Sequence, residues 1–203
     1  MTKNKQVLLE QIKADIIKNN VCPNLAREAT NLVMGDGDTN ADIVIIGEAP
    51  GKKEDESGLP FMGAAGKFLN EMLDSVGIER RDVFITNIVK YRPPKNRDPS
   101  KQEKAEFWPY LLRQLDVIQP KVVVTLGRHS MGYFLPQANI GEVHGQPSGV
   151  EIDSLKLTVV PLYHPAAALY RRSMRSVLID DFKQLPKIIK ILNKPREITG
   201  KEK

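Results

Sequence analysis

Four short apolar runs recur along the chain, and turn residues bound each of them. The runs cover residues 42–46, 83–89, 122–126 and 157–162, and they are rich in Val, Ile and Leu with little polar alternation. Such runs are typical of strands that are covered on both faces of a sheet. The pattern therefore predicts four strands in a mostly parallel sheet.

Helical periodicity lies between these runs. Residues 64–76 carry apolar side chains at spacings of three and four, and Gly77 follows as a plausible C-cap. Residues 101–118 form a second predicted helix, with Ser100 as its N-cap and a bend at Pro109.

Three more helical segments complete the pattern, the last of them interrupted at Pro186, over residues 7–18, 128–135 and 174–192. Strands that alternate with helices predict an α/β fold with helices on both faces of the sheet. We expect a single three-layer αβα domain over residues 1–203, with a central four-stranded sheet and tails at 1–5 and 193–203.

Composition adds constraints on compartment and partners. The 203 residues suffice for one domain, and the formal charge of +5 favours a polyanion such as nucleic acid, although a solvated basic surface explains it equally well. No apolar run approaches the roughly 20 residues that span a bilayer, so no membrane partner is expected. The single cysteine excludes an intramolecular disulfide. With no targeting signal, we expect a cytoplasmic protein, and we predict a monomer.

Unusual residues lie at the ends of three of the predicted strands. The turn 47–51 follows the first strand, Asn87 lies near the end of the second, and His164 comes just after the fourth. In open α/β sheets, ligands bind beyond the carboxyl ends of the strands, so these segments are expected to converge on one pocket.

The first of these segments superficially resembles a phosphate-binding loop. A true phosphate loop has four residues between its glycines and Ser or Thr after the lysine, whereas Gly47 and Gly51 enclose three residues and Lys53 follows Lys52. The glycines instead indicate a tight turn with a close backbone approach. Glu48, Glu54 and Asp55 surround this turn, where carboxylates can orient or deprotonate a water, or simply be solvated.

Three single side chains are candidates for ligand contact. Phe61 is either a stacking platform for a flat ligand or a core residue, and the amide of Asn87 either pairs with a base edge or holds a neighbouring loop. His164 precedes Pro165, which restricts its backbone and fixes the direction of the imidazole.

Basic residues follow the strand ends on the same side as the expected pocket. The stretch 90–97 includes Arg92, Lys95 and Arg97, and the stretch 171–175 includes Arg171 and Arg172. Either stretch can bind phosphates or form a solvated face. Leu169 and Tyr170 can form an apolar wedge that enters a base stack.

Taken together, the motifs resemble those of the family 4 uracil-DNA glycosylases of bacteria and archaea. The resemblance runs from about residue 21 to 185, with motifs in the family's order and at similar spacing. The matching segments are Gly47-Glu48-Ala49-Pro50-Gly51 with Glu54-Asp55, Gly58-Leu59-Pro60-Phe61-Met62-Gly63-Ala64-Ala65-Gly66, Thr86-Asn87-Ile88-Val89-Lys90, Arg92-Pro93-Pro94 and Tyr163-His164-Pro165.

The resemblance implies a DNA-repair enzyme that flips uracil out of DNA and hydrolyses its N-glycosidic bond without a metal. Phe61 and Ala49 would contact uracil, and Asn87 would read its polar edge and pair poorly with cytosine. His164 would donate to the developing oxygen charge. Related glycosylases of another family use an aspartate where Ala49 stands, so the attacking water would be positioned by Glu48, by Glu54 or by backbone groups.

The sequence departs from this family at one feature. Family 4 enzymes generally hold a [4Fe–4S] cluster through four cysteines, and the matching positions here carry Asn19, Cys22, Tyr91 and Phe107. One thiolate cannot hold such a cluster, so we predict no cofactor and expect Tyr91 and Phe107 to replace it by apolar packing.

Two alternatives remain open. One is a catalytically silent protein that binds DNA or a free nucleobase, although DNA binding alone requires none of Phe61, Asn87 and His164. The other is a glycosylase for a different deaminated base, such as hypoxanthine. No lysine is evidently placed as a Schiff-base nucleophile, which favours a monofunctional glycosylase.

Overall fold

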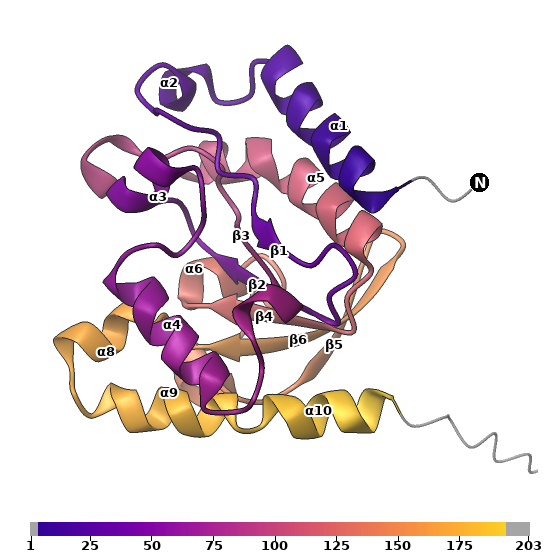
Figure 1. Cartoon of the computed structure of the whole chain (residues 1–203), viewed down its shortest axis with the longest axis vertical. Helices are drawn as coiled ribbons and strands as arrows, with labels where there is room; N and C mark the ends of the chain where they lie inside the picture. Colours follow the sequence, from indigo (N-terminus) through magenta and orange to yellow (C-terminus); the bar gives the residue numbers. More distant parts are fainter. Residues whose placement is uncertain (1–3, 194–203) are drawn as a thin grey trace, which may run out of the picture.

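The computed structural model describes residues 4–193, in which a six-stranded sheet has the order β1-β3-β2-β4-β6-β5 (Figure 1). The strands are β1 (Asp36–Gly37), β2 (Ile43–Gly47), β3 (Phe84–Asn87), β4 (Val122–Leu126), β5 (Ser148–Ile152) and β6 (Leu155–Leu162). The four inner strands are parallel to one another, as the apolar runs predict.

The expected number of strands was wrong, because the sheet gains an antiparallel strand at each edge. β1 contains only two residues, one of them Gly37, and offers no hydrophobic signal. β5 lies at the other edge, where its residues are partly exposed and include Gly149 and Glu151. An edge strand with one solvated side lacks the continuous apolar run that identifies a buried strand.

Helices of very different lengths connect the strands. They are α1 (Lys5–Lys18), α2 (Pro23–Ala26), α3 (Lys52–Ser57), α4 (Ala64–Asp74), α5 (Lys101–Ile118), α6 (Arg128–Met131), α7 (Ile140–Val143), α8 (Ala166–Tyr170), α9 (Met174–Phe182) and α10 (Leu185–Leu192). Short 3₁₀ turns cover Arg80–Asp82 and Pro94–Asn96. No helix in residues 4–193 has both the length and the apolar character needed to cross a bilayer.

The long predicted helices are present, with changes at their ends. Ser100 caps α5 by accepting a hydrogen bond from the Glu103 N–H, and this helix continues through Pro109. The last helical stretch is interrupted at residues 183 and 184, before Pro186 where the break was predicted. Proline fits the first turn of a helix, and Pro186 stands near the start of α10.

Two smaller expectations about the chain ends change as well. Lys5 belongs to α1, which Asn4 caps, and Asn193 caps the end of α10, so the predicted tails are wrong at these three residues. The remainder of the predicted tails, residues 1–3 and 194–203, lies outside the described residues.

Alternate strand residues pack against helices on opposite faces of the sheet. Val44 and Ile46 join a buried cluster with α1 and α5, whereas Ile43 and Ile45 join another with α4, α9 and α10 (Figure 1). The result is the predicted three-layer arrangement of helices, sheet and helices. Because the inner strands are parallel, their carboxyl ends meet at one edge, and Gly47 lies directly beside Asn87 there.

Candidate active site

A cleft of about 670 Å³ opens at the carboxyl edge of the inner strands. It brings together the segments that follow β2, β3 and β6, as expected from the sequence. Its lining includes the predicted residues Glu48, Ala49, Glu54, Phe61, Asn87, Arg97, His164, Leu169 and Tyr170.

Gly47, Phe61 and Asn87 are in close contact at the base of this cleft. Asn87 is 2% exposed and Phe61 is 7% exposed, yet both line the cleft. A Cβ atom at Gly47 would fall 2.8 Å from Phe61 Cζ and closer still to Asn87 Oδ1. Only glycine therefore permits this approach. The Asn87 amide is therefore buried but belongs to the lining of the cleft, where it can bind a ligand.

The loop that carries Phe61 is held by the Glu54 carboxylate. Oε1 accepts hydrogen bonds from the backbone N–H groups of Met62 at 2.7 Å and Gly63 at 2.8 Å, and Oε2 accepts one from Gly51 at 3.1 Å. Phe61 itself has a φ of +53°, a left-handed conformation that costs energy in a residue other than glycine. Glu54 thus stabilises a strained aromatic residue at the cleft.

His164 is a neutral hydrogen-bond donor in this site. Burial lowers its pKa to about 4, and the negative charge of Glu54 opposes this shift only partly. The N–H of Ala166 donates to His164 Nδ1 at 3.1 Å, so the proton of the neutral ring is on Nε2. The imidazole stacks against Phe61 with 5.8 Å between ring centroids.

Glu48 is the carboxylate with unused hydrogen-bonding capacity. Its Oε1 is buried without a hydrogen bond among the described residues, and Lys104 Nζ lies 3.5 Å away. Burial raises the pKa of Glu48, while the positive charges of His129 and Lys104 lower it. Such a carboxylate can hold or deprotonate a water molecule.

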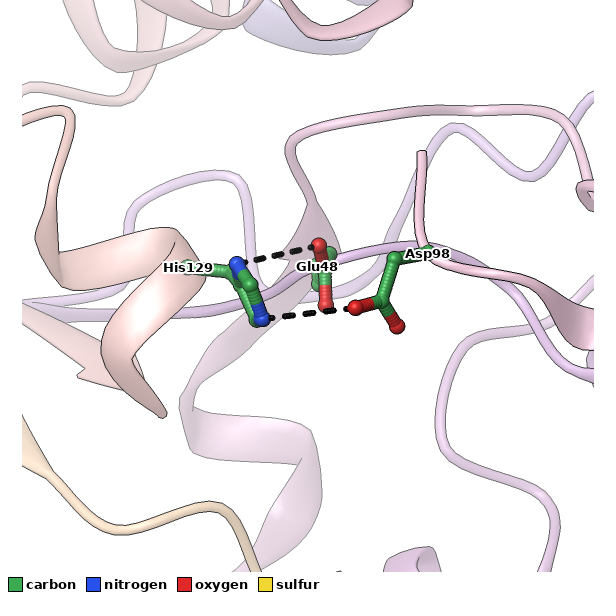
Figure 2. Close-up of side chains that lie close together, drawn as sticks. All are labelled: Glu48, Asp98 and His129. Carbon is green, nitrogen blue, oxygen red and sulfur yellow. Dashed lines mark ion pairs between the residues drawn. The ribbon is translucent and has the colours of Figure 1, made fainter. Parts of the chain in front are cut away.

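Several groups around the cleft carry no recognisable sequence signal. His129 comes from α6 and Asp98 from the segment before α5, and both lie close to Glu48 (Figure 2). Lys104 of α5 approaches the same carboxylate, so residues far apart in the chain surround Glu48. His129 follows the end of β4, and that position was its only available signal.

Lys90 opens the basic stretch 90–97, but its burial means that it cannot bind phosphates as that stretch was expected to. It is fully buried, and it donates hydrogen bonds to the Asn87 carbonyl at 2.6 Å and to Thr86 Oγ1 at 2.7 Å. Burial lowers its pKa to about 7. Lys90 thus holds the backbone that carries Asn87.

The side chains of the predicted basic segments differ in whether they already bind other residues of the protein. Arg97 makes a bidentate ion pair with Glu103, at 2.8 and 2.6 Å, so its guanidinium is already engaged. Arg92 donates to Asn96 Oδ1, and Lys95 is exposed. Arg171 and Arg172 are exposed beyond α8.

Leu169 and Tyr170 protrude from the end of α8. Leu169 is 51% exposed and Tyr170 is 88% exposed, although both side chains are largely apolar. Large exposed apolar side chains at the rim of a cleft are typical of a binding surface.

The residues at the four positions that match the cluster ligands make contacts with other side chains and backbone groups of the protein. Cys22 is fully buried, its thiol donates to the Glu103 carbonyl at 3.6 Å, and burial raises its pKa. Tyr91 packs edge-on against Phe107 at 5.8 Å, as expected, and the amide of Asn19 donates to Tyr110 Oη. These residues do not fit a four-thiolate cluster.

The layered fold and its cleft define a protein that can hold a flat heterocycle between an aromatic ring, a buried amide and a neutral imidazole. The model of the Uracil DNA glycosylase superfamily matches residues 34–192, and the chain belongs to this superfamily.

Individual relatives match over most of their length. A Type-4 uracil-DNA glycosylase of Sulfurisphaera tokodaii is 46% identical over 183 residues, which cover 87% of this chain and 83% of the relative. The Type-4 uracil-DNA glycosylases of Saccharolobus solfataricus and Archaeoglobus fulgidus are each 44% identical, covering 87% of this chain and 84% and 91% of the relatives.

Proposed function

We propose that the protein is a monofunctional uracil-DNA glycosylase, which hydrolyses the bond between uracil and deoxyribose in DNA and so starts base excision repair. The convergence of Phe61, Asn87 and His164 in one cleft is the observation that carries this proposal. The activity named for the relatives supports it.

Uracil enters the cleft after its nucleotide rotates out of the duplex, because the bond to be cleaved is inaccessible in the base stack. The ring stacks on Phe61, beside Ala49. The Asn87 amide offers one donor and one acceptor, which match the O4 and N3–H of uracil. Cytosine presents an amino group and an unprotonated N3 at these positions, so the same amide orientation opposes it.

His164 stabilises the departing base. As the bond between C1′ and N1 breaks, its electron pair moves to uracil, and negative charge develops on the ring oxygens. The Nε2–H of a neutral His164 donates to this charge without a net transfer of its proton. Loss of one such donor costs roughly 3 kcal/mol in comparable sites.

Glu48, rather than Glu54, orients the attacking water. Both oxygens of Glu54 already accept backbone hydrogen bonds, whereas Glu48 has unused acceptor capacity beside the cleft. The water oxygen bonds to C1′, and the water proton that is lost passes to the carboxylate. The products are free uracil and an abasic sugar.

The DNA-binding residues surround the cleft mouth. Leu169 and Tyr170 enter the base stack, and Arg92, Lys95, Arg171 and Arg172 contact phosphates. We assign Arg97 a structural role, since its guanidinium is bound to Glu103.

We also propose that the protein functions without an iron–sulfur cluster. The single cysteine and the packing of Tyr91 on Phe107 support this. A second contact takes over the connection between the N-terminal segment and the loop after β3: Glu103 binds Arg97 on one side and Asn24 Nδ2, at 2.8 Å, on the other.

Iron analysis and an absorption spectrum of the purified protein test the second proposal. We expect neither iron nor a cluster absorption band. Stoichiometric iron would contradict it. Light scattering of the same sample tests the predicted monomer, and a cytoplasmic location stays a prediction.

The activity is tested with an end-labelled oligonucleotide that contains one uracil. Alkali treatment converts each abasic site into a strand break, so a monofunctional enzyme yields product only after alkali. A cytosine strand and the variant Asn87→Ala serve as controls, and neither should give product.

Each failure has a distinct meaning. Cleavage without alkali would show a strand-cleaving activity. No product from folded protein on single- and double-stranded DNA would contradict uracil removal, and a hypoxanthine substrate would then separate a different base specificity from binding alone.

A further inference from the structure

Glu48 is surrounded by charged and titratable groups from separate segments (Figure 2). His129 Nδ1 lies 3.6 Å and Lys104 Nζ 3.5 Å from the same atom, Glu48 Oε1. On the other side of the imidazole, His129 Nε2 is 3.7 Å from Asp98 Oδ2. Tyr133, whose pKa is raised by burial and by the charge of Glu48, faces the carboxylate from the turn after α6.

The orientation of the His129 ring follows from its neighbour in sequence. Arg128 Nε donates to His129 Nε2 at 3.3 Å. A nitrogen that accepts from a guanidinium carries no proton, so the neutral ring has its proton on Nδ1. That N–H is on the side of Glu48 Oε1.

The Lys104 ammonium and the His129 N–H therefore both face one oxygen of the carboxylate. Oε1 is buried with no hydrogen bond of ordinary length, and these two donors lie 3.5 and 3.6 Å from it. A modest inward movement of either side chain would complete a hydrogen bond to Oε1. The second oxygen, Oε2, would then be left for a water molecule.

We propose that His129 is a positioning residue, which fixes the Glu48 carboxylate through Oε1 and keeps it ionised for the attack of water. This rests on the proposed function, because it requires Glu48 to orient the nucleophile. His129 does not contact the substrate in this proposal. It is 32% exposed on its side chain and can exchange protons with solvent, unlike Lys104, which is 11% exposed.

The proposal predicts a change in the pH dependence of base release. Burial and Asp98 favour the protonated form of Glu48, and Lys104 and His129 oppose them. A positive charge on His129 helps to keep Glu48 ionised. Without this charge Glu48 takes up a proton at higher pH, so the acid limb of the rate profile moves upward.

Three variants separate the orientation of the Glu48 carboxylate from the effect of the His129 charge. His129→Phe removes both, and we expect a roughly tenfold lower single-turnover rate at pH 6 and an acid limb shifted upward by about one pH unit. His129→Gln retains a donor without charge. It should recover most of the rate at pH 8 but keep the shifted acid limb. Glu48→Gln abolishes the acid limb itself.

A double-mutant comparison distinguishes this role from a merely structural one. If His129 acts through Glu48, then His129→Phe lowers the rate in the wild-type background and has little effect in Glu48→Gln. An equal loss in both backgrounds, or an unshifted acid limb in His129→Phe, would overturn the proposal.

NMR titration of His129 gives a readout that needs no catalysis. We expect the NMR signals of the imidazole to respond to pH differently in Glu48→Gln, because a negative neighbour is removed. An unchanged titration would also overturn the proposal. If the wild type shows this coupling but releases no uracil, the proposed function itself fails; if it releases uracil without the coupling, only the role of His129 fails.

Discussion

Gly47 and Asn87 are paired across the parallel strands β2 and β3, and a methyl group on Gly47 would collide with the amide of Asn87. The same methyl group would also press on the ring of Phe61. The absence of one side chain therefore sets the distance between the Asn87 amide and the Phe61 ring, the two groups that we propose bind uracil.

Substitution Gly47→Ala should lower the rate of uracil release about 100-fold while the protein stays folded. A displacement of about 1 Å at a reacting centre costs on the order of 100-fold in rate. Single-turnover rates and thermal unfolding test this. Gly149→Ala is the matched control, because a Cβ atom there meets nothing within 4 Å; comparable losses in both variants would refute the steric account.

Replacement by glutamine should have different effects at the two glutamates near the cleft. Glu54→Gln weakens hydrogen bonds from three backbone N–H groups, and we expect a loss of about 2 kcal/mol in the free energy of unfolding together with reduced activity. Glu48→Gln should lower the rate about 100-fold with no loss of stability.

Urea denaturation and single-turnover kinetics on both variants provide the comparison. If Glu54→Gln proved as stable as the wild type but inactive, the assignment of the water to Glu48 would be wrong.

His164 should contribute to the acid sensitivity of folding. Its pKa is about 4 in the folded protein and about 6.5 in an unfolded chain, so the unfolded state binds more protons between these values. The free energy of unfolding should thus fall as pH drops from 6.5 towards 4. His164→Phe removes this contribution, and its stability should fall less steeply over the same interval in urea titrations. Parallel curves would contradict the buried neutral imidazole.

The ion pair between Arg97 and Glu103 should matter more than pairs on the open surface. Hydrogen bonding to Arg97 lowers the pKa of Glu103 to about 2. Because the folded pKa is depressed, the associated stability is present above about pH 4.5 and is lost as pH falls towards 2.

Glu103→Gln should therefore lower the free energy of unfolding at pH 7 by about 2 kcal/mol. Lys121→Met, which removes an exposed partner of Asp42, should cost no more than about 0.5 kcal/mol. Denaturant unfolding of both variants measures the two losses. Equal losses would show that Glu103 does not stabilise the fold by linking Asn24 and Arg97.

The inner sheet could be predicted from sequence because all four parallel strands are buried on both faces. Continuous apolar runs follow directly from that burial. The edge strands are not buried on both faces, and β1 is too short to carry any hydrophobic pattern. The short helix α3 was also missed, because its residues 52–57 are charged and solvated rather than periodic.

The candidate site was predictable only as far as it lies at strand ends. Asn87 ends β3 and His164 lies just beyond β6, and the fold rule places the two residues together. The environment of Glu48 was not predictable, since Lys104 and His129 approach it from helices more than 50 residues away in sequence. The role of Glu54 depends on hydrogen bonds to Met62 and Gly63, which no spacing rule reveals.

The packing of Tyr91 on Phe107 and the binding of Glu103 to Arg97 and Asn24 have a consequence for the physiology of such a chain. Contacts between side chains form as soon as the polypeptide folds, with no assembly machinery to load an inorganic centre. Under the proposal that no cluster is bound, a cell short of iron, or exposed to oxidants that dismantle clusters, would keep this protein intact.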